Sequence, residues 1–140
     1  MSSNIALARA ELAARLESIA PVRTGLAALE TTSAILPVFV IWDVRDSPST
    51  QQEYAAPQFT RQMVVEYKAI AAADYDAAMD TVLHTLRAAL KPNIGEPALA
   101  HATAIRETAV QFFAPAITET GASSIASLQI TFEIDYLERL

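Results

Sequence analysis

The chain contains no cysteine, and this absence removes several kinds of chemistry at once. Disulfide bridges, thiolate zinc sites and cysteine nucleophiles are all excluded. Glycine is also scarce, with 3 in 140 residues, so a glycine-rich loop that cradles a phosphate is hard to build. The ten Lys and Arg residues form no run and the net charge is −6, whereas nucleic-acid binding needs clustered cations. We therefore expect no specific nucleic-acid binding.

Signals for export or membrane insertion are missing as well. The first residues lack the basic segment and the apolar run of a signal peptide, and no apolar stretch is long enough to span a bilayer. We expect no membrane partner and take a reducing cytosol as the default compartment. The 140 residues, 52% hydrophobic and 19% charged, are typical of one globular domain with one core. We expect this single domain to cover residues 1–140.

The clearest feature that is present lies at residues 128–136, where apolar and polar side chains alternate strictly. Successive side chains of a strand point to opposite faces, so one face of this strand is apolar and the other is polar. Such strands are typical of antiparallel sheets with one solvated side. The apolar face has Leu128, Ile130, Phe132, Ile134 and Tyr136, and the polar face has Gln129, Thr131, Glu133 and Asp135.

Two segments have the apolar spacing of amphipathic helices. The first covers residues 5–19, with a capping serine or asparagine among residues 2–4 and Pro21 as its stop. The second covers residues 74–90 and ends before Pro92. Asp74 is its predicted cap, and loss of that cap would cost about 1 kcal/mol.

The remaining segments predict further strands. Residues 35–44 and 59–70 predict an antiparallel hairpin joined by a polar loop at 46–58, and a connection of this length is often functional or mobile. Residues 22–29 and 107–113 are consistent with shorter strands, and the segment 93–106 is ambiguous. These elements predict an α+β fold: a mostly antiparallel sheet of four or five strands with two main helices packed on one face.

One cluster of polar residues lies at the start of the predicted loop. Asp43 and Asp46 flank Arg45, and paired carboxylates can carry out acid–base chemistry when burial separates their pKa values. A solvated strand end followed by a turn is the favoured interpretation. Within the loop, Tyr54 is an aromatic residue among small and polar ones, which suits partner contact. Packing of Tyr54 against its own hairpin explains the pattern equally well.

In this order the elements resemble the small tail terminator and tail-completion proteins of long-tailed bacteriophages. The resemblance rests on an order of elements rather than on a motif, and it carries over no catalytic residue. It extends over nearly the whole chain, through the helix at 5–19, the strand at 36–44, the loop at 46–58, the strand at 59–69, the helix at 74–90 and the closing strand at 128–136.

The resemblance implies a structural, non-enzymatic protein of a phage or prophage that needs no cofactor. Such proteins form a ring, usually a hexamer, that caps the tail tube, ends its polymerisation and provides the head-joining surface. The implied partners are other copies of the chain, the tail tube protein and the head–tail connector or neck protein. The implied location is the virion tail, with the host cytoplasm during assembly.

The sheet edges and the long loop are expected to supply the contacts of such a ring, since each subunit must offer two different complementary surfaces. The acids on the polar strand face are expected to line a lumen through which DNA passes without binding. The candidate contact residues are Arg45, Asp46, Gln52, Glu53, Tyr54, Glu133 and Asp135.

Two alternatives stay open. One is a head-closure or neck protein of the same assembly line. The other is a small α+β enzyme or ligand-binding domain whose candidate groups are His84, Asp43 and Tyr67, provided that they converge in a pocket. The sequence gives His84 and His101 no partner at metal-ligand spacing, so both are interpreted as ordinary surface histidines.

Overall fold

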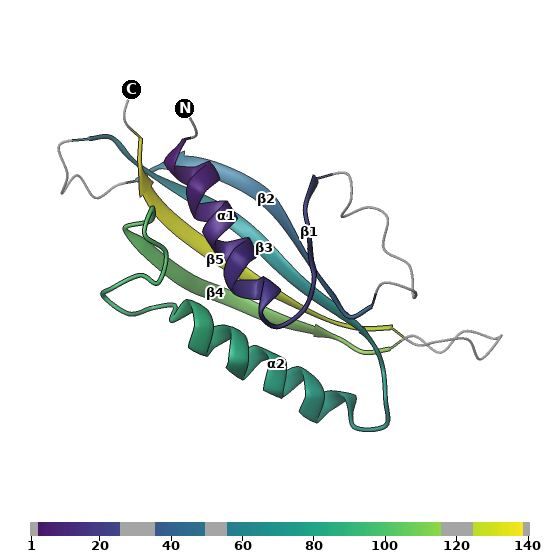
Figure 1. Ribbon diagram of the computed structural model, residues 1–140. Coiled ribbons are helices and arrows are strands. Elements are labelled where there is room, and N and C mark those ends of the chain that lie inside the picture. Colours follow the sequence, from purple (N-terminus) through teal and green to yellow (C-terminus); the bar gives the residue numbers. More distant parts are fainter. Residues whose placement is uncertain (1–2, 26–35, 50–55, 116–124, 139–140) are drawn as a thin grey trace.

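A computed structural model describes residues 3–25, 36–49, 56–115 and 125–138. A five-stranded sheet in the order β1-β2-β3-β5-β4 carries both helices on one face (Figure 1). β1 runs parallel to β2, and the other neighbours are antiparallel. The predicted α+β class, with a mostly antiparallel sheet, is confirmed. The elements are α1 (Asn4–Glu17), β1 (Val22–Arg23), β2 (Val38–Pro48), β3 (Gln58–Ile70), α2 (Tyr75–Leu90), β4 (Ala104–Phe113) and β5 (Ile125–Leu137).

The core lies between the helices and the sheet. Its centre is the apolar face of β5, whose members Leu128, Ile130, Phe132 and Ile134 are fully buried. β5 lies between β3 and β4, so this face receives side chains from both helices. The alternation predicted for residues 128–136 is therefore correct on its apolar side. The buried helix residues are Ile5, Ala8, Leu12 and Leu16 of α1 and Met79, Leu83, Leu86 and Leu90 of α2.

The two helix starts differ from each other. The Ser3 hydroxyl accepts a hydrogen bond from the Ala6 N–H at 3.3 Å, which confirms a cap among residues 2–4. Asp74 occupies the cap position of α2, but its side chain makes no capping hydrogen bond. Its backbone, at φ −106° and ψ 30°, lies outside the extended conformation that a side-chain cap uses. The predicted role of Asp74 is therefore wrong, and the cost of about 1 kcal/mol does not apply.

The predicted loop at 46–58 has wrong boundaries. β2 continues to Pro48 and β3 begins at Gln58, so the connection covers residues 49–57, of which 50–55 lie outside the described residues. The pairs Asp46–Arg61, Ser47–Thr60 and Pro48–Phe59 extend the ladder. A proline is tolerated there because the end of a strand can do without one N–H.

β2 and β4, the strands on either side of the β3–β5 pair, each have a β-bulge. The register between β2 and β3 shifts between Asp43 and Arg45, which leaves Val44 without a partner residue. The register between β4 and β5 shifts between Glu107 and Ala109, which leaves Thr108 without one. A bulge changes which face the following residues occupy. This change decides where the polar groups described below are placed.

Candidate functional site

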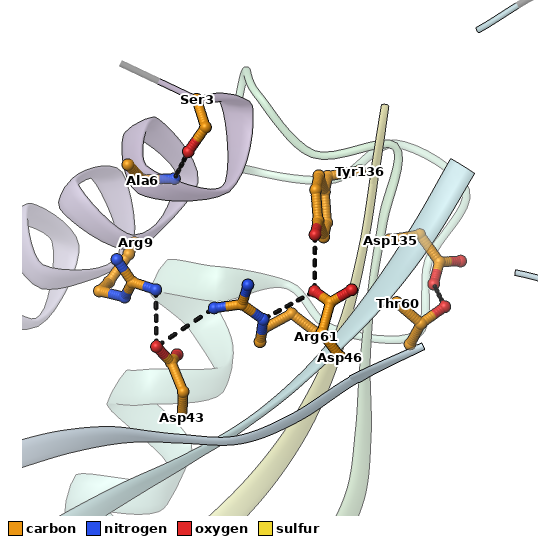
Figure 2. A network of polar contacts seen from close by, with 9 residues as sticks. All are labelled: Ser3, Ala6, Arg9, Asp43, Asp46, Thr60, Arg61, Asp135 and Tyr136. Carbon is orange, nitrogen blue, oxygen red and sulfur yellow. Dashed lines mark hydrogen bonds and ion pairs between the residues drawn. The ribbon is translucent and has the colours of Figure 1, made fainter. Parts of the chain in front are cut away.

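Five polar side chains join the start of α1 to the end of the sheet (Figure 2). The Arg9 guanidinium lies 2.6 Å from the Asp43 carboxylate, and Arg61 lies 3.2 Å from the same oxygen. Arg61 Nε also donates to Asp46 at 2.7 Å, and the Tyr136 hydroxyl donates to Asp46 at 2.6 Å. We call these five residues the Arg61 network.

The bulge in β2 places both carboxylates of the Arg61 network on the helix side of the sheet. Asp43 pairs across the ladder with Met63, a core residue, whereas Asp46 pairs with Arg61. With regular alternation, residues three apart would lie on opposite faces. The extra residue Val44 restores them to the same face.

The electrostatics of the Arg61 network raise the pKa values of Tyr136 and Arg61. Burial raises the pKa of Tyr136, and the hydrogen bond to Asp46 raises it further, to about 12. Burial lowers the pKa of Arg61, but the Asp46 hydrogen bond and the charges of Asp43 and Asp46 outweigh burial, so the pKa is raised overall. Each carboxylate is thus paired with a permanent cation, which suits a structural tie and not proton transfer.

A second polar cluster lies on the sheet face away from the helices. Asp135 is only 5% exposed. Arg106 donates to both of its carboxylate oxygens, at 2.6 and 2.8 Å, and the Thr60 hydroxyl donates at 2.6 Å. Arg106 also reaches Glu133 at 3.3 Å. Burial raises the pKa of Asp135, but the bonds from Arg106 and Thr60 outweigh it and hold the pKa below its usual value.

The expectation that Asp135 is exposed on a wet face is therefore wrong. β4 covers the outer side of β5 and brings Arg106 directly opposite Glu133 in the ladder. The guanidinium neutralises much of the charge that was expected to line a lumen. Of the two acids, only Glu133 stays accessible, and it is half-buried.

The rest of the predicted contact residues have separate positions. Arg45 is exposed just beyond the β2 bulge, and in the described part of the chain it makes no ion pair. Asp46 belongs to the Arg61 network and lies in β2 rather than in a loop. Gln52, Glu53 and Tyr54 lie outside the described residues.

The groups of the predicted enzyme or ligand-binding alternative do not line one pocket. Asp43 lines a groove of about 680 Å³ along the free edge of β2, with Arg9, Thr24, Gly25, Trp42 and Lys68 among its other walls. Tyr67 is absent from that groove and packs against Phe39, with ring centroids 5.1 Å apart. His84 is exposed on α2 and does not line it either.

His101 does have a partner, which the sequence did not indicate. Its Nδ1 lies 2.6 Å from a carboxylate oxygen of Glu11 on α1, and the N–H groups of Ala100 and His101 donate to the same carboxylate. Burial raises the pKa of Glu11, but these bonds outweigh it and lower the pKa overall. The contact fixes the segment before β4 against α1.

Sequence reasoning missed the three arginines that organise the polar clusters. Arg9 lies within the helix predicted at 5–19 but is not one of its apolar residues, and Arg106 lies at the end of the ambiguous segment 93–106. Only Arg61 had a local signal. It occupies the same alternation as Phe59, Met63 and Val65, so a charge on an apolar face indicates a buried partner.

The comparisons add no relative. No protein-family model matches the chain, and no curated protein matches it. Among the described residues, no group of three or more His, Asp or Glu side chains is placed to hold a metal ion. No helix of the described segments has the length and apolar character needed to cross a membrane.

Proposed function

We propose that this chain is a tail terminator of a long-tailed phage or prophage. Copies form a ring that caps the tail tube, ends its polymerisation and presents a surface to the head. The observation that supports this most is the order of the elements. A helix precedes a long hairpin, a second helix follows, and a second hairpin closes the sheet, which is the order on which the resemblance rests.

The shape of the sheet is compatible with a ring. A closed ring uses one surface of each subunit against a different surface of its neighbour. Here the sheet is open, β2 and β4 flank its central strands on opposite sides, and β1 covers only two residues of β2 (Figure 1). The polar face is internally paired, for example through Gln129 and Lys68 on Glu66, so it suits a wet lumen better than a dry interface.

The test uses tail tubes assembled from purified tube protein. We expect the chain to bind at one end of each tube as a ring in electron micrographs, and to stop elongation when fresh tube protein is added. Replacing residues 50–55 by a Gly-Ser linker should abolish tube binding and leave the circular dichroism spectrum unchanged. The matched control is the same six-residue replacement at 118–123, in the connection between β4 and β5.

Two results would contradict the proposal. Tubes that keep growing at the wild-type rate in the presence of the chain would exclude a terminator. Binding to the portal end of isolated heads, with none to tubes, would instead favour the head-closure or neck protein.

A further inference from the structure

An apolar groove of about 330 Å³ lies where the end of β4 meets the start of α2. Phe112, at 53% exposed, and Phe113 are among the most exposed large apolar side chains of the described segments. Two neighbouring aromatic rings that are both partly exposed indicate a surface that binds something apolar. We call this site the edge groove; its walls are Tyr75, Asp76, Met79, Asp80, Phe112, Phe113, Ala114 and Ser127.

Two acidic residues in the wall of the edge groove favour an occupant with a positive charge. Asp76 and Asp80 lie one helical turn apart, and neither makes an ion pair within the described segments. Like charges at this spacing repel each other on a helix. An occupant with a cation beside an apolar side chain would relieve the repulsion and cover the rings.

The chain itself carries a segment of this kind. Val44, the unpaired residue of the β2 bulge, is 52% exposed, and the exposed Arg45 follows it. Arg45 has no ion-pair partner in the described part of its own chain. We call Val44 and Arg45 the bulge pair. It combines an aliphatic side chain with a cation, the two features that the edge groove accepts.

The bulge pair is on β2 and the edge groove is at the end of β4, and these two strands lie on opposite sides of the β3–β5 pair (Figure 1). A contact between them inside one chain is therefore impossible. Between copies, the contact would be head to tail, since a bulge pair of one copy meets an edge groove of the next. A row of copies joined in this way has one free bulge pair at one end and one free groove at the other, so it can add copies until a ring closes.

Among the described residues, the parts of β2 and β4 that no neighbouring segment pairs with on the outer side coincide with these features. β1 pairs with β2 only at Phe39 and Val40, before the bulge. On β4, Asn93 makes the hydrogen bonds that a neighbouring strand would otherwise make. Its N–H donates to the Ile105 carbonyl, and its side chain accepts from the Glu107 N–H. Neither cover reaches the residues beyond the bulges. Proteins usually protect strand edges along their length, so a cover that stops there is consistent with an interface.

We infer that copies of this chain associate head to tail, with the bulge pair of one copy in the edge groove of the next. The inference rests on the ring proposed above, for which it specifies the subunit contact. The aliphatic Val44 side chain would lie against Phe112, and the Arg45 guanidinium would lie between Asp76 and Asp80.

The absence of cysteine allows a direct test by cross-linking. In Val44→Cys/Phe112→Cys, each copy has one thiol on each side of the contact, so mild oxidation should give a ladder of covalent multimers on a non-reducing gel. Each single variant should give nothing larger than a dimer. The matched control is Val44→Cys/Ile94→Cys, because Ile94 is 51% exposed but lies outside the edge groove. Circular dichroism checks that every variant is folded.

Charge reversal then tests the ionic half of the contact. Adding Arg45→Glu to the double-cysteine variant should slow the ladder by about tenfold, since like charges across an interface oppose binding. Adding Asp76→Lys and Asp80→Lys as well should restore it. A ladder no faster than that of the Ile94 control, or a ladder that charge reversal leaves unchanged, would overturn the inference.

The result is separable from that of the proposed function. Multimers that cross-link through the edge groove but do not bind tail tubes would support the head-to-tail contact and contradict the terminator function. Rings on tail tubes that fail to cross-link would retain the terminator and place the subunit contact elsewhere.

Discussion

β2 and β4 lie on either side of the β3–β5 pair and each has a β-bulge, but the groups exposed at the two bulges differ. The bulge of β2 and the bulge of β4 lie on either side of one pair, Met63 of β3 and Phe132 of β5. The residue just before each bulge is an acid, and each acid binds an arginine from a helix: Asp43 binds Arg9 of α1, and Glu107 binds Arg87 of α2. Each bulge thus tethers one helix to one side of the sheet.

The difference lies in what each bulge leaves exposed. On β4, the Thr108 hydroxyl donates to the Thr131 carbonyl, and Asn93 covers the neighbouring edge. On β2, the unpaired residue is the apolar Val44, and the cation after it has no ion-pair partner in the described residues. The β4 bulge is completed within the chain, whereas the β2 bulge offers its groups to the outside. A shared structural element therefore need not have a shared role.

The largest expected effect comes from removing the centre that the two bulges share. Phe132→Ala should lower the free energy of unfolding by about 3–5 kcal/mol, because the ring is fully buried and its loss leaves a cavity. Urea denaturation followed by circular dichroism measures the change. Ile94→Ala is the control, with an effect within about 0.5 kcal/mol because that side chain is 51% exposed. Equal losses in both variants would contradict the burial on which the comparison rests.

The next largest effect is expected from removing the arginine that pairs with the buried Asp135. Arg106→Gln should cost about 2 kcal/mol at pH 7, because Asp135 stays buried with its strongest donor removed. The pKa of Asp135 is held low in the folded protein, so its contribution is present above the unfolded value and is lost as the pH falls through the folded one.

The variant should therefore lose less stability than the wild type on acidification. Titration of the Asp135 carboxyl by NMR should give a higher pKa in the variant. An unchanged Asp135 titration would show that Arg106 does not stabilise the carboxylate.

A smaller effect distinguishes the two tethers directly. Glu107→Gln should cost about 1–2 kcal/mol, since its mostly buried carboxylate takes two bonds from Arg87, at 2.8 and 2.6 Å. Asp43→Asn should cost less than about 1 kcal/mol, because that ion pair is more exposed on the acid side. Both are measured by urea denaturation, with Glu17→Gln as an exposed control. A larger loss for Asp43→Asn would reverse the ranking of the two tethers.

The last prediction concerns the hydroxyl of the Arg61 network. Tyr136→Phe should cost about 1 kcal/mol at neutral pH, since one hydrogen bond to Asp46 is lost. In the wild type the raised pKa of Tyr136 contributes stability that is present below about pH 10 and declines as the pH approaches about 12.

The decline over this pH range should therefore be shallower in Tyr136→Phe. The control is Tyr75→Phe, which removes a hydroxyl that makes no hydrogen bond to the described residues. An alkaline decline of wild-type steepness in Tyr136→Phe would mean that this hydroxyl does not titrate in the folded protein as expected.

The elements of the fold could be predicted because their signals are local. Alternation identified β5, and helical spacing identified α1 and α2, since each pattern depends only on neighbouring residues. The limits of β2 could not be predicted in this way. Residues 45–48 are polar and resemble a loop, yet pairing with β3 keeps them in the strand.

The polar clusters depend on contacts between distant residues, which a single sequence does not reveal. Arg106 and Asp135 meet only because β4 pairs with β5, and their positions relative to Glu133 depend on that register. Asp43 and Asp46 share a face only because Val44 is an extra residue in its strand. No local periodicity predicts a bulge, so the shared face of these two carboxylates could not be predicted from the sequence.

The position of β5 has a consequence for synthesis. β5 follows every other element in the chain, yet it lies between β3 and β4 in the sheet. Until residues 125–137 leave the ribosome, the inner side of β3 has no strand beside it. At about 5–20 residues per second, residues 71–137 take about 3–13 s to translate. During that time the edge of β3 that later pairs with β5 is exposed and can pair with another chain. Protection by a chaperone would therefore matter more before the last strand emerges than after it.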